Sequence, residues 1–155
     1  MMIFHFDLPA ISDNMLYCNN FKGGKGRFVS AAGKTFKKAV YDHTLAQIEQ
    51  QDRNDHKYTE QIKDLANSEL IVAVIHCSSW YTKAGTIRVK DIQNYNKALI
   101  DSCFEALRSI NEDIDDSQIW SFSTNKIDVS ENGNKEYIEI IIKLIDEEED
   151  DDVAD

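Results

Sequence analysis

Two groups of carboxylates flank one amphipathic segment and have the chemistry to bind a divalent metal ion. Asp91 precedes the segment, and the Asp115-Asp116 pair follows it. Hard cations take oxygen ligands, so Asp91 and one of the later aspartates would share an ion if the chain doubles back between them. The competing interpretation is structural, because Asp91 stands where a carboxylate stabilises the N-terminus of a helix. Spacing alone favours this capping role.

The intervening segment has the periodicity of a helix with one buried face. Apolar residues recur at helical spacing from Asn94 onward, and they are Leu99, Ile100, Cys103, Phe104, Ala106, Leu107 and Ile110. The polar residues on the opposite face are Asn94, Lys97, Asp101, Glu105 and Arg108. We therefore expect a helix that packs on a core and exposes Lys97 near its start.

The rest of the chain alternates strands and helices. We expect strands over 2–8, 70–77, 119–129 and 136–145, a helix from an N-cap at Ser30 to about Gln51, and a polar surface excursion over 52–67 with a short helix at 61–66. Asn132-Gly133 predicts a hairpin between the last two strands. This order indicates an α/β (α+β) fold, in which helices pack on one mixed sheet, in a single domain over residues 1–145.

Charge is distributed unevenly along the chain. The net charge is -11, but eight of the 28 acids lie in residues 146–155, which leaves 20 acids and 17 Lys and Arg elsewhere. Residues 14–41 hold six cations and no acid, which is typical of a surface that contacts phosphates. The alternatives are a solvated basic face or a docking site for the acidic tail. The tail is expected to be disordered, and it would compete with DNA, solubilise the chain or capture a basic protein partner.

Residues 78–90 mix cations with aromatic side chains directly before Asp91, and include Trp80, Tyr81, Arg88 and Lys90. Such a mixture can stack on exposed bases and hold phosphates. It suits equally a loop that is pinned by its aromatic residues. His76, near the end of an apolar strand, is expected to be a structural histidine rather than a metal ligand.

Cysteine usage and hydropathy bear on the compartment. Cys18, Cys77 and Cys103 show no paired or CxxC spacing, and the N-terminus does not resemble a signal sequence, so we expect reduced thiols in the cytoplasm. No run of 18 apolar residues occurs, which predicts that the protein does not insert into a membrane.

The chain resembles the RusA family of Holliday junction resolvases. The family motif is Asp-x-Asp-Asn-x-x-Lys, an amphipathic helix, and an Asp-Asp pair followed by a small residue, Gln and an aliphatic residue. Asp91, Asn94, Lys97, Asp116 and Gln118 fit that order. The loop from Tyr17 to Arg27 and the helix start at Ser30 are similar to the N-terminal third of the family.

The resemblance implies a homodimeric endonuclease that cuts four-way DNA junctions symmetrically with Mg²⁺ or Mn²⁺, in recombination and repair within a bacterial or phage-infected cell. It implies that Asp91 and Asp116 hold the metal, with Asp115 as a less suitable substitute, and that Lys97 stabilises charge at the scissile phosphate. The residues implied in DNA contact are Asn14, Lys22, Lys25, Arg27, Lys34, Arg88, Lys90 and Asn94.

Gln93 stands where the family pattern has its second aspartate. An amide oxygen binds hard cations more weakly than a carboxylate, so Gln93 would be a weak metal ligand. The alternative function is therefore a RusA-fold module with weakened or lost catalysis, which binds DNA or another protein.

Overall fold

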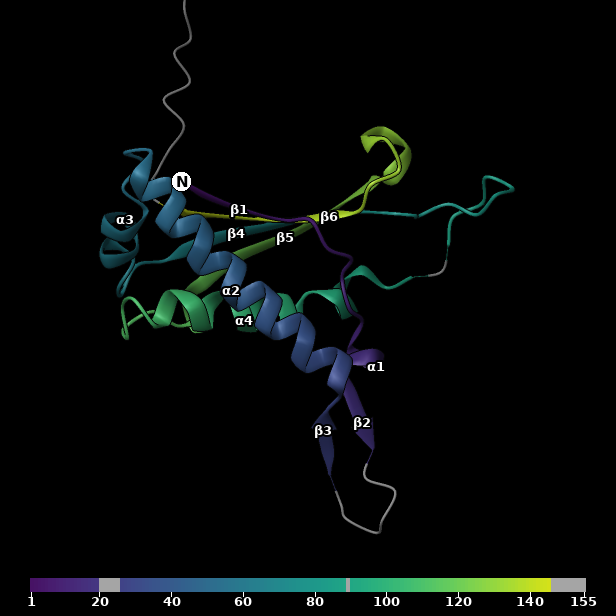
Figure 1. Ribbon diagram of the computed structural model, residues 1–155, viewed down its shortest axis with the longest axis horizontal. Helices are drawn as coiled ribbons and strands as arrows, with labels where there is room; N and C mark the ends of the chain where they lie inside the picture. The colour runs from purple at the N-terminus through teal and green to yellow at the C-terminus, as the bar shows by residue number, and fades with distance from the viewer. Residues whose placement is uncertain (20–25, 89, 146–155) are drawn as a thin grey trace, which may run out of the picture.

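The computed structural model describes residues 1–19, 26–88 and 90–145, and it has the mixed α and β architecture expected from the sequence (Figure 1). In chain order, the elements are β1 (Met2–Phe6), α1 (Asp13–Leu16), β2 (Tyr17–Asn19), β3 (Arg27–Val29), α2 (Ala31–Arg53), α3 (Tyr58–Asp64), β4 (Leu70–Ser78), the 3-10 helix η1 (Ile92–Tyr95), α4 (Lys97–Arg108), η2 (Asp116–Gln118), β5 (Ile119–Asp128), η3 (Val129–Asn132) and β6 (Tyr137–Leu144). None of the helices in these described ranges has the length and apolarity needed to cross a bilayer.

The main sheet has the strand order β1-β6-β4-β5, with β4 and β5 parallel and the other pairs antiparallel. The predicted hairpin between the last two strands is therefore wrong, because β4 lies between β5 and β6. Gly133 and Asn134 do adopt the left-handed conformation of a tight turn, but the chain then passes to the far side of β4. The central position suits β6, whose Ile138, Ile140 and Ile142 are buried, while the polar β5 forms an edge.

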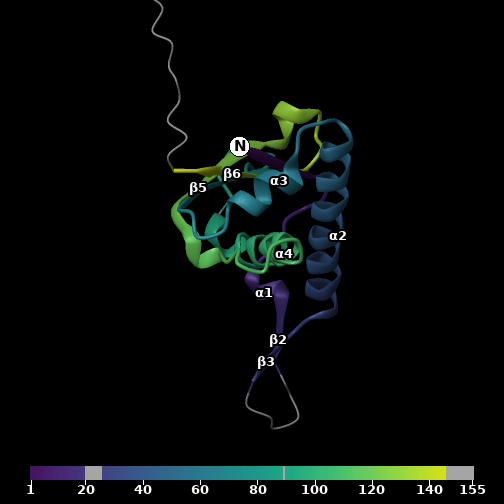
Figure 2. The same cartoon turned by 90° about the vertical axis from the view of Figure 1, so that its left-hand side faces the viewer.

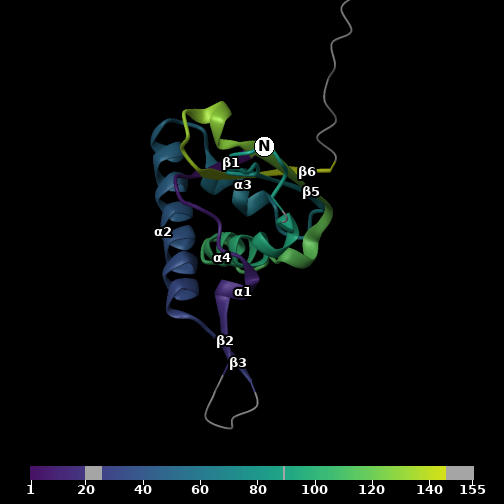
Figure 3. The same ribbon diagram turned by 90° about the vertical axis from the view of Figure 1, so that its right-hand side faces the viewer.

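Helix α4 lies against one face of the sheet, and α2 lies beside it along the β1 edge, where the His5 N–H donates to the Gln47 side chain at 2.8 Å (Figures 2 and 3). The core lies between these helices and the strands. The predicted apolar stripe is confirmed: Leu99, Ile100, Cys103, Phe104, Ala106 and Leu107 are buried, and Ile110 is half-buried. The regular α-helix starts at Lys97 rather than Asn94, because η1 forms the preceding turn.

The segment predicted as a polar surface excursion contributes to the core. Helix α3 spans Tyr58–Asp64 rather than 61–66, and it buries Tyr58, Ile62 and the following Leu65. The Tyr58 hydroxyl accepts a hydrogen bond from the Ile3 backbone N–H at 3.0 Å, which links α3 to β1. The high proportion of polar residues hid these apolar anchors, which lie three or four residues apart on one helix face.

The start of α2 is fixed tightly to α1 and to a projecting hairpin formed by β2 and β3. Ser30 caps α2 as predicted, because its hydroxyl accepts from the Gly33 N–H at 2.9 Å and donates to the Met15 carbonyl at 2.6 Å. A Cβ on Gly33 would lie 2.7 Å from the carbonyl oxygen of Leu16, so only glycine fits. The hairpin extends from this joint away from the sheet (Figures 1 and 2).

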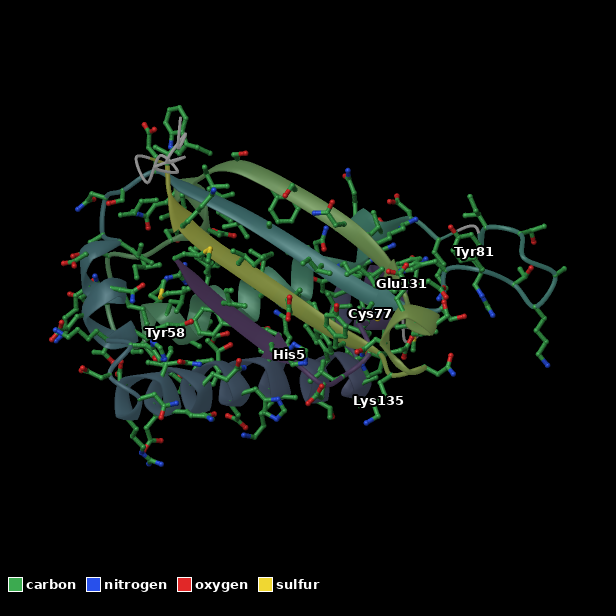
Figure 4. The ribbon with its side chains drawn as sticks, turned by 90° about the horizontal axis from the view of Figure 1, so that it is seen from above. His5, Tyr58, Cys77, Tyr81, Glu131 and Lys135 are labelled. Carbon is green, nitrogen blue, oxygen red and sulfur yellow. The ribbon has the colours of Figure 1, made fainter. Side chains whose placement is uncertain are left out.

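The other face of the sheet is covered by none of the helices in the described residues (Figure 4). Its centre is apolar and consists of Ile3, Ile71, Ala73, Ile75 and Ile141, which are half-buried or partly exposed. On β6, Glu139 and Lys143 flank Ile141 on the same face, so charges of opposite sign lie at either end of the apolar centre.

Candidate functional site

Asp91 lies at the solvent-exposed start of the motif and has the capping role that its position predicts. Its carboxylate accepts a hydrogen bond from the Gln93 backbone N–H at 3.0 Å and so caps η1. The side chains of Gln93 and Asn94 are exposed. Lys97 is also exposed, and its ammonium group lies 3.6 Å from the Asp101 carboxylate one helical turn later. These polar groups therefore share one accessible surface at the start of α4.

The side chain of Asp115 is held by local contacts at the C-terminal end of α4. It forms a capping box with Gln118, and its carboxylate pairs with the Arg108 guanidinium at 2.7 Å. The hydrogen bond from the Ser117 N–H, supported by the Ser117 hydroxyl and Arg108, lowers the pKa of Asp115. Gln118 also donates to the carbonyls of Leu65 and Ser68, so its side chain anchors this turn.

Asp116 faces an acidic cavity rather than Asp91. The cavity has a volume of about 410 Å³ and is lined by Asp101, Phe104, Glu105, Arg108, Asp115 and Asp116. Partial burial and then the negative charge of Asp115 raise the pKa of Asp116. Asp116 is consequently the carboxylate of this pair that would gain most from a bound cation.

A single chain does not bring Asp91 and Asp116 together. Asp91 precedes α4 and Asp116 follows it, and the 12 residues of the helix separate its ends by about 18 Å. Among the described residues, no group of three or more His, Cys, Asp or Glu side chains is placed to hold a metal ion. The residues implied as metal ligands thus form two separate sites in one chain, and neither is complete.

The candidate DNA-contacting residues in the N-terminal third surround the projecting hairpin. Asn14 on α1, Arg27 on β3 and Lys34 in the first turn of α2 are all exposed. Lys22 and Lys25 lie outside the described residues, as does the acidic tail over 146–155. Phe28 beside Arg27 is 53% exposed, which places an aromatic ring next to these cations.

A second group of cations lies on the arm formed by residues 79–88, which extends from the end of β4, and at Lys90 (Figures 1 and 4). Arg88 is exposed, and its Nε donates to the Tyr81 carbonyl at 3.0 Å. The ammonium groups of Lys90 and Lys126 lie 5.4 Å and 4.6 Å from the centroid of the buried Trp80 ring. Trp80 therefore pins the arm and also positions two cations.

Lys126 is a further cation of this group that no sequence pattern singles out. It lies on β5, opposite His76 in the parallel pairing of β4 with β5. The alternation of Thr124 and Lys126 along the strand would have placed both on one face, but the approach of Lys126 to Trp80 depends on the pairing of distant segments. Trp80 is buried and anchors the arm, as in the interpretation of a loop pinned by its aromatic residues. Contact of the arm with bases or phosphates stays a prediction.

His76 is buried, as expected for a structural histidine, and it starts a chain of hydrogen bonds. Its Nε2 lies 2.7 Å from Oδ1 of Asn96, and the Asn96 amide donates to the Thr124 hydroxyl at 3.0 Å. Burial lowers the pKa of His76, although the Asn96 bond opposes this effect. Nδ1 is buried and has no hydrogen-bond partner among the described residues.

Comparison with known proteins does not assign the chain to a family. No protein-family model matches the sequence, and no curated protein matches it.

Proposed function

We propose that this protein is a RusA-like Holliday junction resolvase, a homodimer that binds branched DNA and cuts it with Mg²⁺ or Mn²⁺. The observation that carries the proposal is the position of the Asp91–Lys97 motif. It lies exposed at the start of α4, directly after an arm that bears Arg88 and Lys90. A carboxylate beside an array of cations is the combination that phosphoryl transfer on DNA requires.

DNA binding is proposed to use the two cationic groups already described, on the projecting hairpin and on the arm. Phosphate contacts by Arg27, Lys34, Arg88 and Lys90 would give affinity without base specificity. Lys22 and Lys25 would extend the first group. Because the hairpin projects from the sheet, it suits a branched substrate better than one straight duplex.

The homodimer is proposed to form through the uncovered face of the sheet. Its apolar centre resembles half of a protein interior, and a two-fold axis that runs antiparallel copies of β6 past each other would place Glu139 opposite Lys143 of the second copy. Ile141→Glu should therefore yield monomers in sedimentation equilibrium, whereas Ala31→Glu, at an exposed position in the first turn of α2, should remain dimeric.

Metal-dependent cleavage is assigned to Asp91 and Asp116, with Asp115 and Gln93 as weaker ligands and Lys97 as the group that stabilises charge. The residues of one chain do not complete such a site, because α4 separates the two aspartates. The remaining oxygen ligands would have to come from a second copy or from the phosphates of the DNA, as is common for Mg²⁺.

The test is incubation of the protein with a labelled four-way junction and a linear duplex of equal length, in Mg²⁺, in Mn²⁺ and in chelator. Paired symmetric nicks that require metal are expected on the junction alone. Asp91→Asn and Asp116→Asn should abolish these nicks. Glu112→Gln should not, because Glu112 is an exposed acid that lies between the two aspartates in the sequence and has no proposed role. Metal-dependent cutting that survives Asp91→Asn would refute the assignment.

A second candidate is a RusA-like module that binds junctions without cutting them. It is favoured by the separation of Asp91 from Asp116 and by the amide at Gln93. This candidate predicts junction-selective binding with no product in either metal. Gln93→Asp distinguishes the two, because an added carboxylate should raise cleavage where the site is otherwise intact and should have no effect on a silent protein.

A further inference from the structure

His76 lines a cavity at the carboxyl end of β4. Its Nδ1 is buried and has no hydrogen-bond partner among the described residues. The cavity has a volume of about 150 Å³. Nε2 lies 2.7 Å from the side-chain oxygen Oδ1 of Asn96, so the proton of the neutral ring resides on Nε2 and Nδ1 is an acceptor. A buried acceptor without a donor is costly, so this site is built to receive an N–H or O–H group from outside the chain.

The other walls have the chemistry of a site for a flat aromatic ring. Trp80 and Tyr95 line the cavity together with His76. Tyr95 meets the His76 ring edge to face, with centroids 6.3 Å apart. Trp80 is held in place by the hydrogen bond from its indole N–H to the His76 carbonyl at 3.0 Å. Aromatic walls around a fixed acceptor favour a planar ligand with an N–H edge.

A cation completes the site. Lys90 also lines the cavity, and its ammonium group is held by the Ser79 carbonyl at 3.3 Å and by the Trp80 ring. Lys90 immediately precedes Asp91, so the cavity adjoins the proposed reaction centre. A buried acceptor on a residue that lines an aromatic cavity, and a lysine that lines the same cavity, match the two ends of a nucleotide, its base and its phosphate.

We propose that this cavity binds one unstacked nucleobase at the branch point of the DNA. The inference rests on the proposed function and adds to it a base-binding pocket beside Asp91. The N–H edge of the base donates to Nδ1 of His76, its ring lies against Trp80 and Tyr95, and its phosphate contacts Lys90. Each of the four bases has an N–H on its pairing edge, so this contact favours an unpaired base without selecting one.

The experiment combines abasic DNA with protein variants. A series of four-way junctions is prepared, each with a single abasic residue at a different position next to the branch point. The dissociation constant of the protein for each junction is measured in chelator. For wild-type protein, we expect one position at which loss of the base weakens binding by about five- to 150-fold, the range for one base–aromatic stack. His76→Phe and Tyr95→Leu should weaken binding to the intact junction and cause little further loss with that abasic junction. Tyr41→Leu, a half-buried tyrosine on α2, is the matched control.

A second measurement does not depend on changing the cavity. Trp80 and Trp120 are the two tryptophans of the chain, so Trp120→Phe leaves Trp80 as the reporter. Its fluorescence should be quenched by the intact junction and not by the junction that lacks the critical base.

The outcomes separate this inference from the proposed function. Two results overturn the base pocket alone, provided that the wild-type protein binds the junction tightly. One is that no abasic position weakens binding; the other is that the variants lose as much affinity for the critical abasic junction as for the intact one. Absence of junction-selective binding by the wild-type protein overturns the proposed function and the pocket with it.

Discussion

Gly33→Ala tests the joint that carries the projecting hairpin. In an ordinary helix, this substitution would stabilise the protein by about 1 kcal/mol, because alanine is the better helix former. Here the new Cβ would lie 2.7 Å from the Leu16 carbonyl oxygen, 2.9 Å from Leu16 Cδ1 and 3.0 Å from Val29 Cγ1. The backbone carbonyl cannot rotate away as a flexible side chain can, so α1 must shift relative to α2.

Two destabilising effects and one stabilising effect set the expected change in the free energy of unfolding. Overpacking of this kind costs about 1–3 kcal/mol. The Leu16 carbonyl also accepts the Ser30 N–H at 2.8 Å, and weakening that bond costs about 1 kcal/mol more. After subtraction of the helix-propensity gain, Gly33→Ala should lower the free energy of unfolding by about 1–3 kcal/mol.

Urea denaturation measures this change, and Ala32→Gly provides the control. Ala32 is exposed in the same turn of α2, so its replacement reports helix propensity alone and should cost about 1 kcal/mol. If Gly33→Ala is as stable as the wild-type protein or more stable, the close contact does not constrain the joint and the reasoning is refuted. Junction binding should fall in Gly33→Ala, because the hairpin is re-aimed, and should persist in Ala32→Gly.

Three further predictions concern charge. Lys126→Met should weaken binding to junctions of any sequence and reduce the slope of log affinity against log salt by about one, as expected for one phosphate contact; an unchanged slope would show that Lys126 only supports Trp80. His5, although its burial opposes protonation, has a raised pKa because its ring nitrogens lie 3.0 Å from the carboxylates of Glu139 and Asp7. Its stabilisation is present below the unfolded pKa near 6.5 and is lost as pH rises through the higher folded value, so thermal melts should show the advantage of wild type over His5→Gln at pH 5.5 and its disappearance by pH 8.5. Deletion of residues 146–155 should strengthen DNA binding if the tail competes for the basic surface; weaker capture of a basic protein partner would identify the tail as an interaction segment instead.

The parts of the fold that sequence predicted are those set by local periodicity. The buried stripe of α4 and the continuous apolar run of β4 follow from spacing alone, and so does the capping of α2 by Ser30. The pairing of strands does not, because the turn at Gly133 is compatible with a hairpin and with passage across β4. Which outcome occurs depends on the relative apolarity of β5 and β6, a competition between distant segments.

The candidate site shows the same division. Asp91 was correctly placed at an exposed helix start, since that role depends on its immediate neighbours. The distance between Asp91 and Asp116 depends on whether the chain turns back after α4 toward the start of that helix. Asp116 instead stays near the C-terminal end of α4, directly before β5. The approach of Lys126 to Trp80, across 46 positions of sequence, is likewise a product of strand pairing that periodicity does not encode.

The strand order also constrains how the chain reaches its native state. Among the described residues, β6 is the last strand to be synthesised, yet it occupies the interior of the sheet between β1 and β4. Until residues 137–144 are available, the first strand has no neighbour to pair with and one edge of β4 stays open. Most of the hydrogen bonding of the sheet must therefore form late and between distant segments, which slows folding and leaves apolar edges open to other chains. Synthesis of β6 is thus the step that commits this protein to its fold.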